Sequence, residues 1–141
     1  MKRNASAQWQ GDLKSGKGSV STESGVLAAT PYSFSTRFEN GKGTNPEELV
    51  AAAHAGCFTM ALSAELGKAN LVAQSLRTTA TITLDRVDGA FKITESHLEV
   101  VAKIPGASDD AFQKAAHAAE TGCPISKLFN TKITLAAQLE A

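Results

Sequence analysis

The chain has 141 residues, near the commonest length of a single domain, and 43% of them are hydrophobic, which suffices for one buried core. Fourteen basic residues balance fourteen acidic ones, so nothing in the charge favours binding to nucleic acid or to an anionic membrane. The basic N-terminus is followed by no apolar run. We therefore expect neither a signal peptide nor a transmembrane segment, and we expect a soluble cytoplasmic protein.

The first part of the chain predicts three strands, at residues 5–11, 18–24 and 31–38, separated by turns rich in Gly, Ser and Lys. In the third strand, Tyr32, Phe34 and Phe38 occupy alternate positions. A period of two places Arg37 on the face opposite these aromatic side chains. That face is predicted to be exposed to solvent or part of an interface.

Residues 45–68 carry the signature of a long helix. Asn45 is a predicted N-cap, Pro46 takes the first helical position, and Glu47 and Glu48 lie in the first turn. Asn45 with Glu48 three residues later resembles a capping box. Apolar residues surround most of the helix between positions 58 and 66, a pattern typical of a centrally buried helix.

The rest of the chain predicts a hairpin, two helical segments and a closing strand. Asp88-Gly89 is a hairpin turn, and the alternation of apolar residues loses phase near Glu95-Ser96, where a bulge is possible. Ser108 caps a helix that Gly122 stops, and Cys123-Pro124 begins another helical turn. Residues 132–140 form the last strand. With no repeat and no linker, the whole chain, residues 1–141, is predicted to be one α+β domain.

Two cysteines and three histidines limit the available chemistry. His54 and Cys57 lie three residues apart and would share a helical face, so with Cys123 and a further histidine they could bind a metal ion. Packing is the alternative role for both. A Cys-His hydrolase with His54 or His117 as the base is conceivable, but no spacing favours it. Zinc, nucleotide and serine-hydrolase motifs are absent from the sequence.

A redox role for the thiols is better supported, because structural disulfides are rare in the cytoplasm. The reactive species is the thiolate, which a cation or a helix N-terminus stabilises. Arg37, Arg77, Arg86 and nearby lysines are candidate cations, and the sequence does not choose among them. A cysteine in an Ala-rich helix can equally be an inert small hydrophobe.

Six stretches carry a family resemblance: WQGDLKSGKG, STESGVL, PYSFSTRFE, GTNPEELVAAAHAGCF, TGCP and ITLAAQL. Together they cover nearly the whole chain and resemble the OsmC/Ohr family of peroxide-reducing proteins. The HAGCF sequence and the arginine of TRFE resemble the OsmC branch. The resemblance implies an OsmC-like fold with antiparallel sheets around a central buried helix. It also implies an intertwined homodimer with active sites at the interface.

The resemblance further implies a thiol-dependent peroxidase that prefers organic hydroperoxides to hydrogen peroxide and serves as an antioxidant in stress responses. Cys57 would be the peroxidatic residue, and Cys123 would resolve its sulfenic acid to an intramolecular disulfide. Arg37 would stabilise the thiolate and polarise the peroxide, and Glu47 would orient Arg37. No cofactor is implied. An external dithiol such as a lipoyl group would reduce the disulfide.

One physical conflict modifies this expectation. Glu47 and Cys57 lie ten residues apart, which is about 15 Å along one unbroken helix, so one arginine cannot easily contact both. We therefore predict a helix break near His54 to Gly56, which would place Cys57 at the N-terminus of a second helix and favour its thiolate. The same reasoning applies to Cys123, just ahead of Pro124. Arg37 is predicted to act on Cys57 across a dimer interface.

Some assignments remain open at the level of sequence. Phe58 and Met60, with aromatic residues of the strands, could line an approach for organic peroxides, although core packing is slightly favoured. His54 is interpreted as a packing or capping residue without a catalytic role. Two alternatives to the peroxidase remain: a non-catalytic protein with a Cys/His metal site, and a structural dimer with inert thiols.

Overall fold

The computed structural model of the protein describes residues 1–140. They divide into two compact units, one of Met1–Leu49 and one that starts at Val50. Each unit contains one three-stranded sheet, and the mixture of sheets and helices agrees with the predicted α+β class. The assignment of residues 1–141 to a single domain stays a prediction, and its last residue lies outside the described ones.

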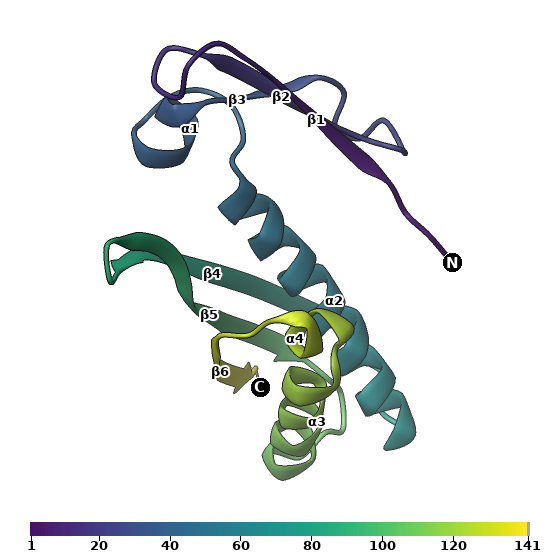
Figure 1. The fold of residues 1–141 in the computed structure, drawn as a ribbon. Coiled ribbons are helices and arrows are strands. Elements are labelled where there is room, and N and C mark those ends of the chain that lie inside the picture. The colour runs from purple at the N-terminus through teal and green to yellow at the C-terminus, as the bar shows by residue number, and fades with distance from the viewer. Residues whose placement is uncertain (141) are drawn as a thin grey trace. The chain divides into compact units, whose positions relative to one another are not determined.

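The first unit holds an antiparallel sheet and a short helix (Figure 1). Its strands β1 (Ala5–Gln10), β2 (Lys17–Thr22) and β3 (Thr30–Tyr32) lie in the order β1-β2-β3. The first two strands occur where the sequence predicts them. The third expected strand, at 31–38, is wrong beyond Tyr32, because the chain turns there into helix α1 (Phe34–Phe38).

Ser33 ends the third strand by capping α1. Its hydroxyl accepts a hydrogen bond from the Thr36 N–H at 3.2 Å, and the Thr36 hydroxyl accepts one from the Ser33 N–H at 2.8 Å, which completes a capping box. Phe34 and Phe38 pack with their ring centroids 4.9 Å apart, as residues four apart on a helix do. The alternation that suggested a strand is therefore a helical pair, and Arg37 lies in the last turn of α1 rather than on a sheet face.

Helix α2 (Pro46–Lys68) begins where the sequence predicts. The Asn45 side-chain oxygen accepts a hydrogen bond from the Glu48 N–H at 2.8 Å, as an N-cap does. The Glu48 carboxylate accepts its side-chain hydrogen bond from the Thr44 hydroxyl at 2.7 Å. The Asn45 amide also donates to the Thr36 carbonyl oxygen at 3.2 Å, so the end of α1 is fastened to the start of α2.

Helix α2 continues without interruption to Lys68, so the predicted break near His54 to Gly56 is wrong. A helical glycine costs only about 1 kcal/mol relative to alanine. Gly56 is surrounded in sequence by strong helix formers, and the turns after it are held by the buried side chains of Phe58, Leu62 and Leu66. Packing therefore outweighs the weak propensity of one residue.

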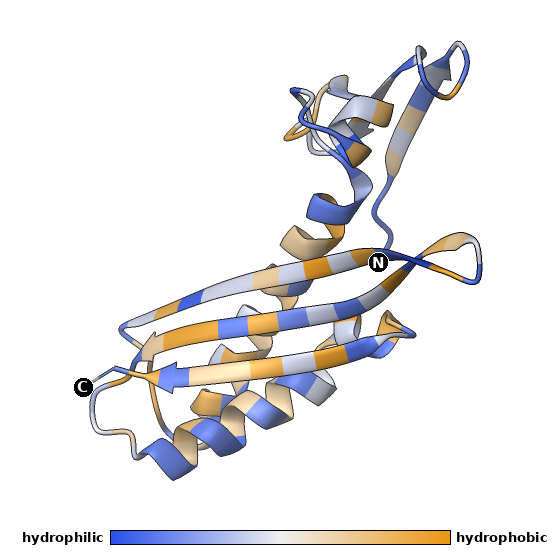
Figure 2. Ribbon diagram, turned by 90° about the vertical axis from the view of Figure 1, so that its left-hand side faces the viewer, coloured by the Kyte–Doolittle hydropathy of each residue, from blue (hydrophilic) through white to orange (hydrophobic). Residues whose placement is uncertain are grey.

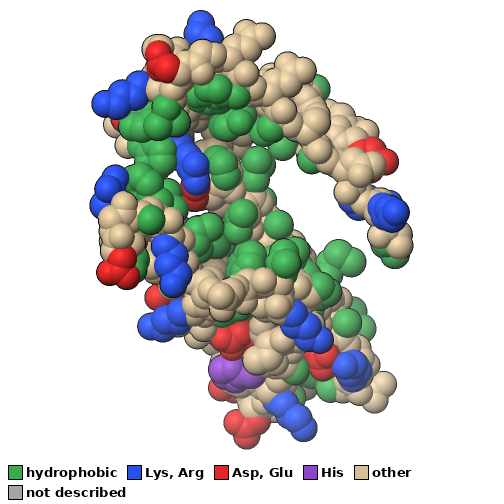
Figure 3. Space-filling model, viewed as in Figure 1, with side chains coloured by type: hydrophobic (Ala, Val, Ile, Leu, Met, Phe, Trp, Pro, Cys, Tyr) green, Lys and Arg blue, Asp and Glu red, His purple; other side chains and the backbone are tan. Residues whose placement is uncertain are grey.

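In the single chain, α2 is buried along one stripe rather than all round. Its fully buried residues, His54, Phe58, Leu62 and Leu66, follow one another at four-residue intervals. Met60 projects from another face with 77% of its surface exposed, and apolar side chains remain visible at the surface in Figure 3. By length and composition α2 could also cross a membrane, a test that the core helix of a soluble protein passes as well.

The sheet of the second unit contains β4 (Ser75–Val87), β5 (Ala90–Lys103) and β6 (Lys132–Leu139) in that order. The predicted turn joins β4 to β5, with Asp88 and Gly89 both at positive φ, 52° and 81°. The register shifts between Thr83 and Leu84, so Thr94 on the opposite strand has no partner. This bulge lies next to the position where the sequence loses phase.

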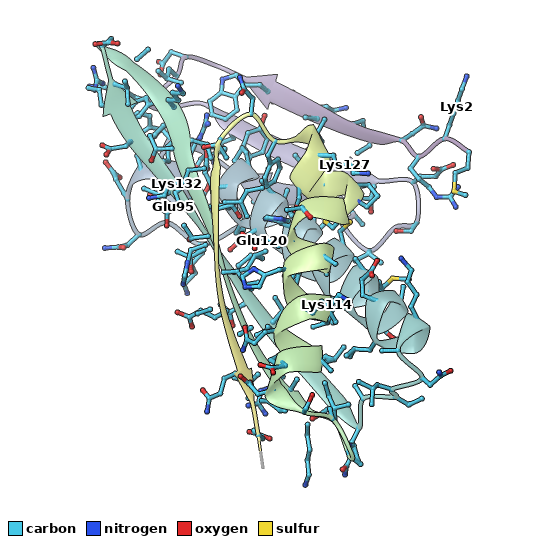
Figure 4. The ribbon with its side chains drawn as sticks, turned by 90° about the horizontal axis from the view of Figure 1, so that it is seen from below. Lys2, Glu95, Lys114, Glu120, Lys127 and Lys132 are labelled. Carbon is cyan, nitrogen blue, oxygen red and sulfur yellow. The ribbon has the colours of Figure 1, made fainter. Side chains whose placement is uncertain are left out.

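Strand β6 runs parallel to β5, so the expectation of purely antiparallel sheets is wrong for this unit. The chain returns to the sheet through α3 (Asp109–Gly122) and α4 (Pro124–Leu128), which supply the crossover that a parallel pair requires. Glu95 and Lys132 are paired in register and form an ion pair at 3.8 Å. Both residues are labelled in Figure 4.

The core of the second unit lies between its sheet and its helices, which occupy one side of the sheet in Figure 2. Ser108 caps α3 as predicted, and α3 buries Phe112, Ala115, Ala116 and Ala119. These side chains pack with the buried stripe of α2 and with Leu98 and Val100 of β5. Cys123 belongs to the same core cluster, so the second thiol is anchored in the core of this unit.

Candidate active site

The two cysteines lie side by side in the second unit. The Cys57 and Cys123 sulfur atoms are 3.0 Å apart, and both residues are free thiols. Cys57 is half-buried, whereas Cys123 is fully buried. Sulfur atoms in a disulfide lie about 2.05 Å apart, so bond formation requires an approach of only about 1 Å. The geometry permits the intramolecular disulfide that the family resemblance implies.

Local structure at two helix ends positions Cys123. The residue terminates α3 and is the N-cap of α4, with Pro124 at the first helical position. The Ser126 N–H donates a hydrogen bond to the Cys123 sulfur at 3.4 Å. Cys57 meets this thiol from the middle of α2, on the side of the helix that also carries His54, three residues before it.

The surroundings of the two thiols shift their pKa values in opposite directions. Burial raises the pKa of the Cys57 thiol and its hydrogen bond with Cys123 raises it further, while the Ile125 N–H opposes both. Burial also acts to raise the pKa of Cys123. Its hydrogen bond with Cys57 and those with the N–H and hydroxyl of Ser126 outweigh burial, so the pKa of Cys123 is lowered. Without a cation at Cys57, the first negative charge is therefore favoured on Cys123.

Cys57 does not lie at a helix N-terminus, contrary to our expectation. Because α2 is continuous, the helix itself uses the backbone N–H groups around Cys57. The N–H groups that act on the thiols belong instead to the first turn of α4: the Ser126 N–H donates to the Cys123 sulfur, and the Ile125 N–H acts to lower the pKa of both thiols. Only Cys123 occupies the capping position expected of a thiol ahead of a helix.

Arg37 and Glu47 form an ion pair in the first unit. The Arg37 Nε and Nη2 atoms lie 2.8 and 2.7 Å from the same Glu47 oxygen, Oε1. The guanidinium also lies over the Phe38 ring, 5.3 Å from its centroid. The second oxygen, Oε2, is buried and has no hydrogen-bond partner among the described residues. The pairing of Arg37 with Glu47 is thus present, with capacity left on both side chains.

The other candidate cations and bases serve different contacts. Arg86 lies over the Phe91 ring at 4.8 Å beside the hairpin turn, and Arg77 is exposed on β4. His117 is exposed on α3 and lies 3.3 Å from a Glu120 oxygen. Among the residues described from 50 to 140, no cationic group contributes to the pKa shift of Cys57 or of Cys123.

An apolar pocket of about 280 Å³ lies beside Arg37 in the first unit. It is lined by Trp9, Leu13, Tyr32, Ser33, Phe34, Arg37 and Phe38. The sequence indicated aromatic residues of the strands as a lining, and Trp9 of β1 is one of them; it missed Leu13, which lies in the turn after β1. Phe58 is fully buried in the core, so the core packing that the sequence analysis slightly favoured is confirmed for this residue. Met60 is exposed and lies outside this pocket.

His54 is fully buried, and serines contact both of its ring nitrogens. Nδ1 lies 2.6 Å from the Ser96 hydroxyl oxygen, and Nε2 lies 2.8 Å from that of Ser126. Burial lowers the pKa of His54, so the imidazole is neutral. These contacts engage the nitrogens that a metal site would need. The described residues contain no group of three or more His, Cys, Asp or Glu side chains that could hold a metal ion.

The four predicted site residues are thus brought together as two pairs, Cys57 with Cys123 and Arg37 with Glu47, each within one unit. That the two pairs make one site stays a prediction. Sequence reasoning did not foresee the contacts of His54 with Ser96 and Ser126, because those serines lie 42 and 72 residues further along the chain. No local pattern marks such a contact.

Comparison with known proteins places these observations in a family. Residues 39–137 match the family described as OsmC-like protein. The chain is 50% identical over 139 residues to Peroxiredoxin OsmC of Escherichia coli (strain K12), spanning 99% of this chain and 97% of that protein. It is 28% identical over 124 residues to the organic hydroperoxide resistance protein OhrB of Bacillus subtilis (strain 168), spanning 87% and 89%.

Solved structures show the same fold. An OsmC-like protein of unknown function from Vibrio cholerae superposes with a TM-score of 0.78 at 18% identity, over 97% of this chain and 99% of that one.

Proposed function

The chain belongs to the OsmC-like protein family, and on that premise we propose that it is a thiol-dependent peroxidase of the peroxiredoxin type. One observation carries the proposal: the Cys57 and Cys123 sulfur atoms lie 3.0 Å apart as free thiols. Thiols so placed can cycle between dithiol and disulfide with little movement of the backbone. The relatives named peroxiredoxin and organic hydroperoxide resistance protein support the same class of reaction.

In the proposed cycle the Cys57 thiolate attacks the distal oxygen of a hydroperoxide. The O–O bond breaks, the sulfur gains a hydroxyl group as sulfenic acid, and the alkoxide takes up the proton that the thiol released and leaves as an alcohol. The Cys123 sulfur then attacks the Cys57 sulfur. The S–S bond forms, the S–O bond breaks, and the hydroxide leaves as water with the proton of Cys123. The peroxide is reduced by two electrons, and the two thiols are oxidised to one disulfide.

Exposure supports the order of the two cysteines. Cys57 is half-buried and can be reached by a substrate, whereas Cys123 is fully buried behind it. Charge favours the opposite order, because the pKa of Cys57 is raised by burial and that of Cys123 is lowered by its hydrogen bonds. A cation beside Cys57 would reverse this preference. The proposed mechanism therefore needs one.

We assign that cation to Arg37. Glu47 engages the Nε and Nη2 atoms of the guanidinium, and the Nη1 hydrogens are not needed for this ion pair. They would hydrogen-bond the thiolate and the peroxide oxygens and stabilise negative charge as it moves from sulfur to the leaving oxygen. Glu47 would hold the guanidinium in one orientation, which lowers the entropic cost of that contact.

We further propose a homodimer in which Arg37 acts on Cys57 of the partner subunit. The support lies on α2, which presents a stripe of exposed small and apolar residues: Ala52, Ala53, Gly56, Met60 and Ala64. Exposed apolar stripes of this kind are typical of surfaces that another chain covers. The intertwined dimer implied by the resemblance would cover this one.

Organic hydroperoxides are the proposed substrates because an apolar pocket adjoins Arg37. Its lining of Trp9, Leu13, Tyr32, Phe34 and Phe38 would bury an alkyl or aryl group while Arg37 binds the peroxide end. Hydrogen peroxide has no apolar part, so it would gain nothing from this lining. An external dithiol, for example a lipoyl group, would reduce the disulfide by exchange in the cytoplasm, with no prosthetic group involved.

A steady-state assay tests this function. An alkyl hydroperoxide and hydrogen peroxide are each supplied with a lipoyl reducing system and then with thioredoxin as electron donor. We expect consumption of both peroxides, with the higher kcat/KM for the alkyl hydroperoxide, and an intramolecular disulfide by intact mass and non-reducing gel. The Cys57→Ser/Cys123→Ser double variant is the control. If neither peroxide is consumed with any dithiol, the thiols are inert and the proposal is wrong.

A further inference from the structure

A buried chain of hydrogen bonds leads from β5 to the resolving thiol. The Ser96 hydroxyl of β5 contacts His54 Nδ1 at 2.6 Å, and His54 Nε2 contacts the Ser126 hydroxyl of α4 at 2.8 Å. Ser126 in turn donates its N–H to the Cys123 sulfur at 3.4 Å, and its hydroxyl acts to lower the pKa of Cys123. The peroxidase cycle described above uses none of Ser96, His54 and Ser126.

The number of protons on these three side chains allows two arrangements of the hydrogen bonds. A neutral imidazole has one nitrogen that donates and one that accepts, and each serine hydroxyl has one proton to donate. If Nδ1–H donates to Ser96, then Ser126 must donate its only proton to Nε2. If Ser96 donates to Nδ1 instead, Nε2–H donates to Ser126, and the hydroxyl proton of Ser126 can point at the Cys123 sulfur. Only the second arrangement offers that proton to a thiolate.

The environment favours the second arrangement once charge develops on sulfur. A hydrogen bond to an ionised acceptor is roughly twice as strong as one between neutral groups, and aligned hydrogen bonds polarise one another. His54 is fully buried and packs edge-on against Phe129 at 4.8 Å, which keeps the imidazole neutral and its orientation fixed. Ser96 is also fully buried, so water does not compete for its proton.

We propose that Ser96, His54 and Ser126 form a relay of aligned hydrogen bonds that stabilises the Cys123 thiolate and so activates this residue for attack on the Cys57 sulfenic acid. Ser126 contacts the reacting sulfur and is a catalytic residue of the resolving step. His54 and Ser96 act through it and are positioning residues. The relay transfers no net proton: the S–S bond forms and the S–O bond breaks. The hydroxide leaves as water with the proton that Cys123 has given up.

The role in turnover rests on the proposed peroxidase function, but the effect on the thiol can be tested without any peroxide. In a Cys57→Ser background, the ultraviolet absorbance of the Cys123 thiolate is titrated against pH. We expect Ser126→Ala and His54→Phe each to move this titration about one pH unit higher, a tenfold loss of thiolate near neutral pH. In His54→Gln, the amide can both accept and donate, so the titration should return most of the way to its position with His54 present.

Thr59 on α2, the helix that carries His54, offers a matched control. Thr59→Val removes a hydroxyl that contacts the Ala55 carbonyl at 2.6 Å and Thr78 at 2.7 Å but neither thiol, and it should leave the titration in place. Unchanged titration in folded Ser126→Ala would overturn the relay. If His54→Phe does not fold, Ser126→Ala decides alone.

A kinetic measurement then links the relay to the reaction. With Cys57 present, rapid mixing with an alkyl hydroperoxide and quenching with dimedone separates sulfenic acid from disulfide by mass. Ser126→Ala should form sulfenic acid within about twofold of the wild-type rate and disulfide about tenfold more slowly. A shifted titration without any peroxide consumption would reject the peroxidase and keep the relay, whereas equal rates of disulfide formation would reject its role in resolution.

Discussion

The sulfur atoms of Cys57 and Cys123 lie 3.0 Å apart, and the first turn of α4 directs the Ser126 N–H at the Cys123 sulfur. One thiol comes from the middle of a long helix and the other from the N-cap of a short one. Because only about 1 Å separates this contact from a disulfide bond, oxidation can be completed by side-chain rotation within one folded chain.

This geometry predicts different outcomes for the two cysteine variants. Cys57→Ser should abolish peroxide consumption. Cys123→Ser should consume about one equivalent of peroxide per chain and then stop, because its sulfenic acid has no thiol beside it. Peroxide loss without reductant and dimedone labelling followed by mass spectrometry give the two stoichiometries. The reverse result, with Cys57→Ser still active, would assign the first attack to Cys123, whose pKa is lowered by its hydrogen bonds.

The continuity of α2 predicts that Gly56→Ala stabilises the protein. Gly56 lies inside the helix without positive φ, and a Cβ placed there meets nothing within 4 Å in the chain. Alanine should raise the free energy of unfolding by about 0.5–1 kcal/mol, measured by urea denaturation. Gly67→Ala, also helical with an open Cβ position, should act in the same direction. A marked loss of stability at Gly56 alone would indicate that another chain covers this position too closely for a Cβ, since Gly56 lies on the stripe that the proposed dimer covers.

Features set by neighbouring residues could be predicted from the sequence. The N-cap at Asn45, the Asp88-Gly89 turn and the Ser108 cap depend on local hydrogen bonds and on local φ, and all three are found. Helix α1 was missed because residues 32–38 fit both a period of two and a helical pair four apart. The hydrogen bonds between Ser33 and Thr36 decide for the helix.

Features set by distant residues could not be predicted in this way. The parallel pairing of β6 with β5 depends on the crossover through α3 and α4, which strand patterns do not encode. The approach of Cys123 to Cys57 joins positions 66 residues apart, and only the family resemblance indicated it. The break in α2 was inferred by assigning one arginine of one chain to both Glu47 and Cys57. The proposed contact from a second subunit would remove the need for that break.

The apolar pocket predicts a change in substrate preference. Leu13 lines the pocket but is 67% exposed, so Leu13→Ser should leave the fold intact. It should lower kcat/KM for a bulky alkyl hydroperoxide by about three- to tenfold, because roughly 1 kcal/mol of apolar contact is lost, and leave hydrogen peroxide unaffected. Val26→Ser is the matched control, since Val26 is 84% exposed and lies outside the pocket. Equal losses for both peroxides would separate the pocket from substrate binding.

Burial of His54 predicts a loss of stability in mild acid. Burial lowers the pKa of His54 below its ordinary value of about 6.5, so between these two pKa values the unfolded chain binds a proton that the folded chain does not. The free energy of unfolding should therefore fall as pH drops below about 6.5, by at most about 1.4 kcal/mol per pH unit, and this contribution should be constant above it.

Urea denaturation from neutral pH to pH 5 measures this slope. His54→Gln should flatten it, because this substitution removes the buried imidazole whose pKa is lowered. The same slope in wild type and His54→Gln would show that another group is responsible.

The proposed dimer predicts that two inactive variants restore each other. Arg37→Met supplies an intact Cys57 and Cys123, and Cys57→Ser supplies an intact Arg37 with its partner Glu47. If Arg37 acts on Cys57 of the partner subunit, a mixed dimer contains one complete site and one doubly defective site. After subunit exchange, half of the dimers are mixed, so the activity should recover to about one quarter of the wild-type value.

If Arg37 acts within its own chain, no complete site forms in any dimer and the mixture stays inactive. Exchange itself is verified by native mass spectrometry of differently tagged subunits. Met60→Glu places a charge on the exposed stripe of α2 and should abolish both dimer formation and activity, since Cys57, whose pKa burial raises, then lacks the cation proposed to lower it. An active monomer would show that Arg37 of the partner subunit is not required. The thiolate would then depend on a contact within one chain.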